Sequence, residues 1–124
     1  MKINFDNRDP VYVQVVRHFK EQIAIGKLEP GQEIPSRREL ANQLKINPNT
    51  AQRAYKEMEE QGLIHTERNF PSTITKDEKI LGGVREELLF NAVDSFLQAV
   101  RPINVPLDEL MSIVQEKYMK ENEK

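Results

Sequence analysis

Two helix-start signals lie close together between residues 36 and 48, and they constrain this chain more than any other feature. Residues 36–39, Ser-Arg-Arg-Glu, have the form of a capping box, in which serine and glutamate satisfy each other's backbone amides. Asn47 followed by Pro48 is a second start, with asparagine as the cap and proline at the first helical position. Lys45 and Ile46 separate the two helices, so the pattern predicts a helix-turn-helix, whose second helix enters the major groove of DNA.

The second of these helices has two different faces. Its predicted inward stripe is Ala51, Ala54, Tyr55 and Met58, and Gly62 is expected to end it. Its predicted outward residues are Asn49, Thr50, Gln52, Arg53 and Lys56. Amide, guanidinium, hydroxyl and ammonium groups are the donors and acceptors that base edges and phosphates need. Asn47 and Thr50 lie at the helix start, where free amides and the helix dipole favour phosphate.

The distribution of charge agrees with an anionic partner for this segment. The whole chain has a net charge of −2, which argues against a uniformly basic coat. Residues 34–56, however, carry five basic side chains and one acidic one, a local net charge of +4. A concentrated positive patch of this kind is the electrostatic footprint of a nucleic-acid site.

The flanking segments complete a winged helix. Asp9 is predicted to cap a helix that has Pro10 at its first position, and Tyr12, Val15, Val16, Phe19 and Ile23 form its apolar face. Residues 63–67 and 72–75 are short β-prone runs around a turn at 69–71, which predicts a hairpin. The fold class is therefore mainly α with a small β-hairpin: a winged helix-turn-helix plus a C-terminal two-helix dimerisation segment.

Composition excludes several other classes of protein. With 124 residues the chain has room for one compact domain or two very small ones. It has no cysteine, and its two histidines, His18 and His65, are expected to be neither metal ligands nor catalysts. No apolar run is long enough for a membrane span, and the N-terminus lacks a signal-peptide core. We find no catalytic constellation, so we expect a cytoplasmic protein that is not an enzyme and needs no cofactor.

The C-terminal part is predicted to hold two chains together. We expect a DNA-binding domain at 1–76 and a helical dimerisation tail at 77–124, because the helix from 77 to 100 is apolar around more of its circumference than one neighbour can cover. The predicted dimer contacts are Leu88, Leu89, Ala92, Val93, Phe96, Leu97, Val100, Leu110 and Val114. The alternative is a monomer in which this helix folds back on the first helix.

Three motifs resemble the GntR family of bacterial transcription regulators. They are Pro-Ser-Arg-Arg-Glu-Leu-Ala at 35–41, Ile-Asn-Pro-Asn-Thr at 46–50, and Ala-Tyr-Lys-Glu-Met-Glu-Glu-Gln-Gly-Leu-Ile at 54–64. The opening at 10–14 and the turn at 28–31 match as well, so the resemblance covers about residues 10–68. The Asn-Pro-Asn-Thr helix start and the short two-helix tail look like the YtrA-type branch.

The resemblance implies roles for single residues. Ser36 and Arg38 would contact phosphate, Asn49 and Thr50 would make polar contacts at the start of the recognition helix, and Arg53 lies one turn further on beside Gln52. The candidate DNA-binding set is Ser36, Arg37, Arg38, Asn47, Asn49, Thr50, Gln52, Arg53, Lys56 and Arg68. Many family members have arginine where Pro48 stands. Their wings usually carry Gly-x-Gly, where this chain has Asn69 and Pro71, so it departs from the family in the residues that bring a wing close to DNA.

The function these features predict is a transcription regulator, a repressor, that binds a near-palindromic double-stranded DNA operator as a homodimer. A winged-helix module that binds another protein and never touches DNA is the alternative. The sequence specifies neither the operator, nor the regulated genes, nor an effector.

Overall fold

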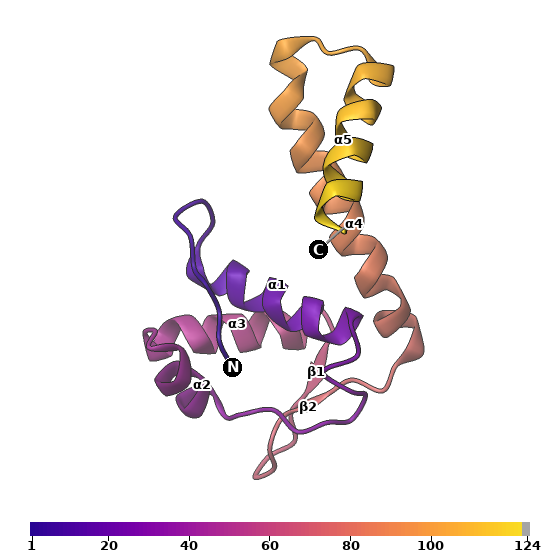
Figure 1. Ribbon diagram of the computed structural model, residues 1–124. Helices are drawn as coiled ribbons and strands as arrows, with labels where there is room; N and C mark the ends of the chain where they lie inside the picture. The colour runs from indigo at the N-terminus through magenta and orange to yellow at the C-terminus, as the bar shows by residue number, and fades with distance from the viewer. Residues whose placement is uncertain (123–124) are drawn as a thin grey trace. The chain divides into compact units, whose positions relative to one another are not determined.

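Helices dominate the computed structural model of this protein, which describes residues 1–122 (Figure 1). In chain order the elements are α1 (Val11–Ala24), α2 (Arg37–Leu44), α3 (Pro48–Glu60), β1 (Ile64–His65), β2 (Thr73–Ile74), α4 (Glu78–Val100), the 3-10 turn η1 (Arg101–Ile103) and α5 (Leu107–Glu121). The chain divides into two units, Met1–Leu89 and Phe90–Lys124. The predicted fold class, mainly α with one small hairpin, is confirmed.

The local start signals of α2 and α3 form as predicted. The Ser36 hydroxyl accepts from the backbone N–H of Glu39 at 3.1 Å, and Glu39 Oε1 accepts from the N–H of Ser36 at 3.2 Å. Asn47 Oδ1 accepts from the N–H of Asn49 at 2.8 Å. Between the two helices Lys45 takes a left-handed conformation with φ of 55°, and this one residue turns the chain.

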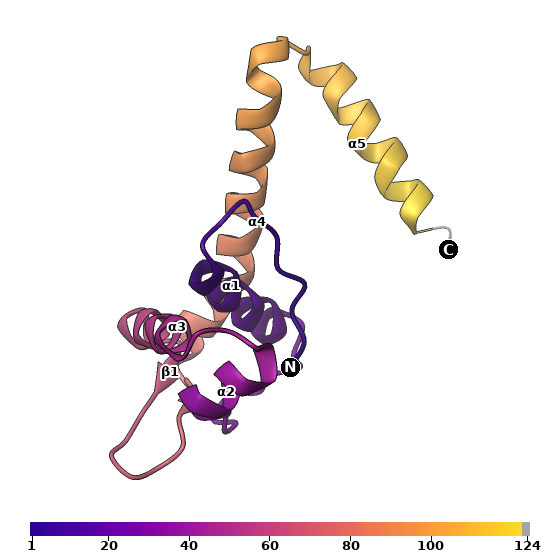
Figure 2. The same cartoon turned by 90° about the vertical axis from the view of Figure 1, so that its left-hand side faces the viewer.

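The core of the first unit lies where α1, α3 and the hairpin meet. Phe19 and Tyr55 are fully buried, and their rings meet edge to face with centroids 6.1 Å apart. In both views α1 and α3 lie side by side (Figures 1 and 2), and α2 packs against α3. The inward stripe predicted for α3 is confirmed, because Ala51, Ala54, Tyr55 and Met58 are all fully buried.

The hairpin is shorter than the sequence suggests. β1 and β2 pair antiparallel with Ile64 opposite Ile74, and one further bridge joins Glu33 to Thr73. The buried face of the hairpin closes the core, while a long loop projects between the strands (Figure 2). In that loop Asn69 has φ of 70°, the left-handed conformation that asparagine tolerates better than most side chains.

The predicted start of α1 is wrong in detail. Pro10, rather than Asp9, occupies the N-cap position, and no side chain caps the helix. The carboxylate of Asp9 instead pairs with Arg17 at 2.7 Å, and its carbonyl accepts from Gln14 Nε2 at 2.8 Å. The buried Gln14 also holds the backbone of Asp6, so this glutamine takes over the anchoring of the N-terminal segment.

The first part of α4 belongs to the first unit, which differs from the predicted boundary at residue 76. Val84 is buried in the core, and Lys20, a residue only 7% exposed, reaches Glu87 with its ammonium group at 2.7 Å. Leu88, one of the predicted dimer contacts, packs against the same core and is partly buried there. The beginning of α4 therefore packs on the core of the first unit, beside α1.

In the second unit no described residue is buried. The remainder of α4 and α5 diverge from the turn at η1 (Figure 2). Large apolar side chains on both helices face solvent, among them Phe90 at 63% and Leu107 at 71% exposure. The predicted contacts Leu89, Ala92, Val93, Phe96, Leu97 and Val114 are all exposed, while Val100 and Leu110 are half-buried.

Candidate nucleic-acid interface

The outer edge of α3 is polar and open to solvent. Asn49, Gln52, Arg53 and Lys56 are exposed, and Thr50 is half-buried. Because the opposite side of α3 is fully buried in the core, the packing that folds the unit also fixes which residues face outward. The two cationic residues on this edge, Arg53 and Lys56, have no carboxylate within 4 Å among the described residues. Their charge is therefore available to an anionic partner.

The starts of α2 and α3 offer a second set of donors. Ser36 uses its hydroxyl oxygen as a cap acceptor, which leaves its hydroxyl hydrogen free to donate. Asn47 uses its side-chain carbonyl in the same way, so its amide NH₂ is the part that can reach outward. Both residues are exposed. Each cap residue therefore stabilises the start of its helix and also keeps a free hydrogen-bond donor at the surface.

Arg37 and Arg38 are neighbours with different surroundings. The Arg37 guanidinium pairs with the carboxylate of Glu59 and stacks over the ring of Tyr55 at 5.1 Å. Arg37 thus ties α2 to α3, and its charge is neutralised within the protein. Arg38 is exposed and has no carboxylate within 4 Å in the described part of the chain. Of the two, Arg38 is the one whose charge is not paired within the described residues.

Tyr55 holds the backbone that leads into α2. Its hydroxyl donates to the carbonyl of Pro35, the residue directly before the capping serine. Burial raises the pKa of this phenol far above its ordinary value of 10, although the nearby Arg37 charge acts in the opposite direction. Tyr55 therefore stays protonated and keeps its donor at all physiological pH values.

Arg53 is held by an aromatic ring instead of a carboxylate. Its guanidinium carbon lies 3.9 Å from the centroid of the Tyr12 ring, and its Nη2 donates to the Tyr12 hydroxyl at 3.2 Å. Tyr12 was expected to face the core with the rest of its helical stripe, but it is half-buried, and its outer part supports Arg53. Nothing in the spacing of α1 marks this role, because the two residues are 41 positions apart.

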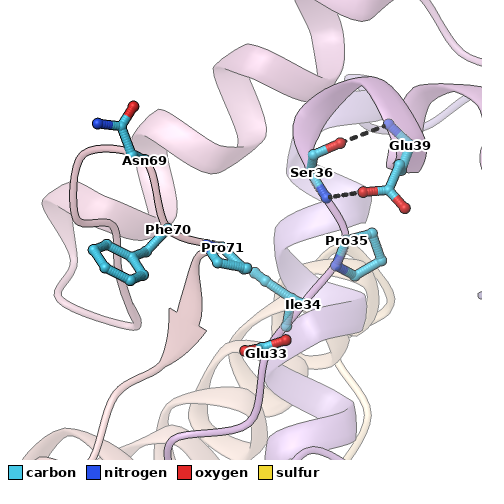
Figure 3. Close-up of a pocket in the computed structure, with 8 residues that line it drawn as sticks. All are labelled: Glu33, Ile34, Pro35, Ser36, Glu39, Asn69, Phe70 and Pro71. Atoms are coloured by element: carbon cyan, nitrogen blue, oxygen red, sulfur yellow. Dashed lines mark hydrogen bonds between the residues drawn. The ribbon is translucent and has the colours of Figure 1, made fainter.

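The wing loop carries one arginine and one exposed aromatic side chain that the sequence did not lead us to expect. Arg68 is exposed in the loop, and Phe70 is 68% exposed at its tip. Figure 3 shows the tip residues Asn69 to Pro71 across an open hollow of about 630 Å³ from Ser36 at the start of α2. The wing tip and the capped end of α2 thus border the same concave surface, which also includes the acids Glu33 and Glu39.

No group of three or more histidine, cysteine, aspartate or glutamate side chains within residues 1–122 is arranged to hold a metal ion. Over the same range, no helix combines the length and apolar character that crossing a bilayer requires.

The first unit is a winged helix-turn-helix whose recognition-helix edge is exposed and positively charged, and this defines a DNA-binding transcription regulator. A family model described as bacterial regulatory proteins, gntR family, matches residues 11–74. That range is more than half of the sequence, and the chain belongs to the gntR family.

Individual relatives agree with this assignment. The chain is 30% identical over 111 residues to the uncharacterized HTH-type transcriptional regulator YhcF of Bacillus subtilis, covering 90% of this chain and 92% of that protein. It is 41% identical over 70 residues to the HTH-type transcriptional repressor YtrA of Bacillus subtilis, covering 56% and 54%. A solved GntR family transcriptional regulator from Listeria monocytogenes superposes with a TM-score of 0.81 at 29% identity, covering 90% of this chain and 98% of that one. The predicted YtrA-type branch is confirmed.

Proposed function

We propose that this regulator is a repressor that binds a near-palindromic operator as a homodimer, with the outer edge of α3 in the major groove. The observation that carries the proposal is the two-sidedness of α3. Its Ala51, Ala54 and Tyr55 side is locked into the core, and its Asn49 and Arg53 side is exposed. The repressor activity of YtrA, by its name, supports the direction of regulation.

Each candidate side chain has a part in this proposal. Arg53, Gln52 and Asn49 read base edges, since guanidinium and amide groups make paired hydrogen bonds with guanine and adenine. Phosphates are held from the starts of α2 and α3 and from the outer edge of α3, by Ser36, Arg38, Asn47, Thr50 and Lys56. Arg68 holds a phosphate from the wing. Arg37 supports this surface from within, through Glu59 and Tyr55.

The homodimer rests on the second unit. Val93, Leu97 and Val114 are exposed apolar residues on α4 and α5 in a unit with no buried described residue. Apolar surface of this extent marks an interface in a stable protein. A two-fold dimer presents two copies of α3 about 34 Å apart, one turn of DNA, and the operator should have matching half-sites. Binding operator DNA places the protein in the cytoplasm and requires no enzymatic activity or cofactor.

Selection of genomic fragments bound by the purified full-length chain tests the proposal. We expect a motif with two inverted half-sites, bound at least about 1,000-fold more tightly than random duplex. Repeating the titration at about 50 mM and about 200 mM salt should weaken binding steeply, because bound phosphates release counterions. A reporter placed behind the selected motif should be expressed more strongly when the gene for this chain is deleted.

Two outcomes would contradict parts of the proposal separately. Absence of any salt-sensitive binding to duplex DNA, genomic or random, would favour the protein-interaction alternative. A single, unrepeated half-site in the selected motif would leave DNA recognition standing and remove the symmetric homodimer.

A further inference from the structure

Two arginines of the first unit stack on tyrosines, and the two pairs differ in what neutralises the charge. Arg37 lies over Tyr55 and also pairs with Glu59. Arg53 lies over Tyr12 at 3.9 Å, donates to the Tyr12 hydroxyl at 3.2 Å, and has no carboxylate within 4 Å in the described residues. The first pair is a cross-link between helices. The second fixes the position of an arginine whose charge stays available.

We propose that Tyr12 is a positioning residue for base reading: it holds the Arg53 guanidinium at the surface of α3 in a binding-ready orientation. This inference rests on the proposed function, since it assigns a role in operator recognition to a residue of α1, outside the helix-turn-helix itself. The ring face binds the cation without cancelling its charge. One of the five guanidinium N–H donors goes to the Tyr12 hydroxyl, and four remain for DNA.

The energetic reason is preorganisation. A free arginine side chain on an exposed helix samples many rotamers, and ordering it on binding weakens the complex. A guanidinium already stacked at 3.9 Å and hydrogen-bonded loses less freedom when it meets a base pair. Tyr12 can supply a stable platform because α1 and α3 are packed together, in part through the edge-to-face contact of Phe19 with Tyr55.

The experiment is a mutant cycle on the operator found by genomic selection. Tyr12→Leu removes both ring and hydroxyl, Tyr12→Phe removes the hydroxyl alone, and each is combined with Arg53→Ala. We expect Tyr12→Leu to weaken operator binding by about three- to tenfold, with unchanged affinity for random duplex, and Tyr12→Phe to restore most of it. In the Arg53→Ala background Tyr12→Leu should have no further effect, because residues that act as a unit are not additive.

A control and a DNA-free measurement keep the test decisive. Arg17→Ala, at an exposed arginine of the same helix, should leave operator affinity unchanged. In the free protein, the Arg53 side-chain protons should show a ring-current shift by NMR that Tyr12→Phe retains and Tyr12→Leu abolishes. This shift is measurable even if the chain binds no operator, so failure of the proposed function and failure of the positioning role are distinguishable.

Three results would overturn the inference. One is an unshifted Arg53 spectrum in the unaltered chain. Another is an equal loss from Tyr12→Leu with and without Arg53, which would mean that Tyr12 acts on DNA by itself or on the fold. The third is tighter operator binding by Tyr12→Leu, which would mean that the tyrosine holds Arg53 away from DNA. If Tyr12→Leu does not fold, the Arg53 ring-current shift in the unaltered chain and in Tyr12→Phe decides the matter: a shift in both supports the stacked position, and no shift in either overturns it.

Discussion

The two units of this chain differ in how far their apolar side chains are buried. In Met1–Leu89 the large apolar residues converge on Phe19, Tyr55 and Val84, which are almost completely inaccessible to solvent. From Phe90 onward no described residue is buried, although the apolar residues are as large. The difference teaches that the first unit has a sufficient core of its own, while the second leaves a surface that a second chain can cover.

The strongest way to test this contrast is to remove one phenylalanine from each unit. Phe19→Ala deletes a fully buried ring and should lower the free energy of unfolding by about 3–5 kcal/mol, measured by chemical denaturation. Phe96→Ala, at a 37% exposed ring of the second unit, should change the unfolding of the first unit far less and should instead weaken self-association. Similar losses of stability for both variants would show that Phe96 also belongs to a core, and the contrast between the two units would then be wrong.

The next effect concerns the open surface of the second unit. Val93→Glu combined with Leu97→Glu places two charges on exposed apolar positions of α4. We expect monomers by sedimentation equilibrium and a loss of operator affinity on the order of 100-fold, because the two half-sites are then bound independently. Gln98→Glu adds a charge at an exposed polar position of the same helix and should leave both properties intact.

Circular dichroism separates loss of assembly from loss of fold. The double variant should keep the helical signal and the thermal transition of the first unit, since its core lies elsewhere. A dimer that persists despite both glutamates would place the interface on another surface.

Local signals in the sequence predicted the local structure well. The capping box at Ser36, the asparagine cap at Asn47 and the buried stripe of α3 depend on residues within one or two helical turns, and all three are found. The hairpin was also predictable, because its strands are bounded by turn residues. These are the features that position the candidate DNA-binding edge.

Contacts distant in sequence were beyond such reasoning. Arg37 and Arg38 are identical in type and adjacent, and the partner that distinguishes them, Glu59, lies 22 positions away from Arg37. The support of Arg53 by Tyr12 and the ion pair of Lys20 with Glu87 span longer intervals still. Asp9 had a proper capping side chain, but Arg17 takes its carboxylate. In each case a partner beyond the local helical turn decided the outcome.

The two adjacent arginines give a smaller, sharper test within the first unit. Arg37→Ala should cost about 1 kcal/mol of stability, through the lost partly exposed ion pair and stacking, and should lower operator affinity indirectly. Arg38→Ala should leave the thermal transition unchanged and reduce the slope of log affinity against log salt by about one unit. If Arg37→Ala reduced the salt slope and Arg38→Ala did not, the ion pair between Arg37 and Glu59 would have to break when the protein binds DNA.

The smallest expected effect is a pH dependence confined to the first unit. Burial lowers the pKa of His18 below 6.5, with the charge of Glu21 opposing the shift. The unfolded chain then binds this proton more readily than the folded chain, so stability falls as the pH drops through 6.5 toward the lower folded pKa, and the loss is complete below that value.

The melting temperature should therefore be lower at pH 5.5 than at pH 7.5, and His18→Gln should remove this part of the change while His65→Gln retains it. Because residues 90–124 contain no histidine, self-association should stay constant over the same interval. A dimer that dissociates between these two pH values would show that the assembly depends on a group of the first unit, and the contrast between the two units would then break down.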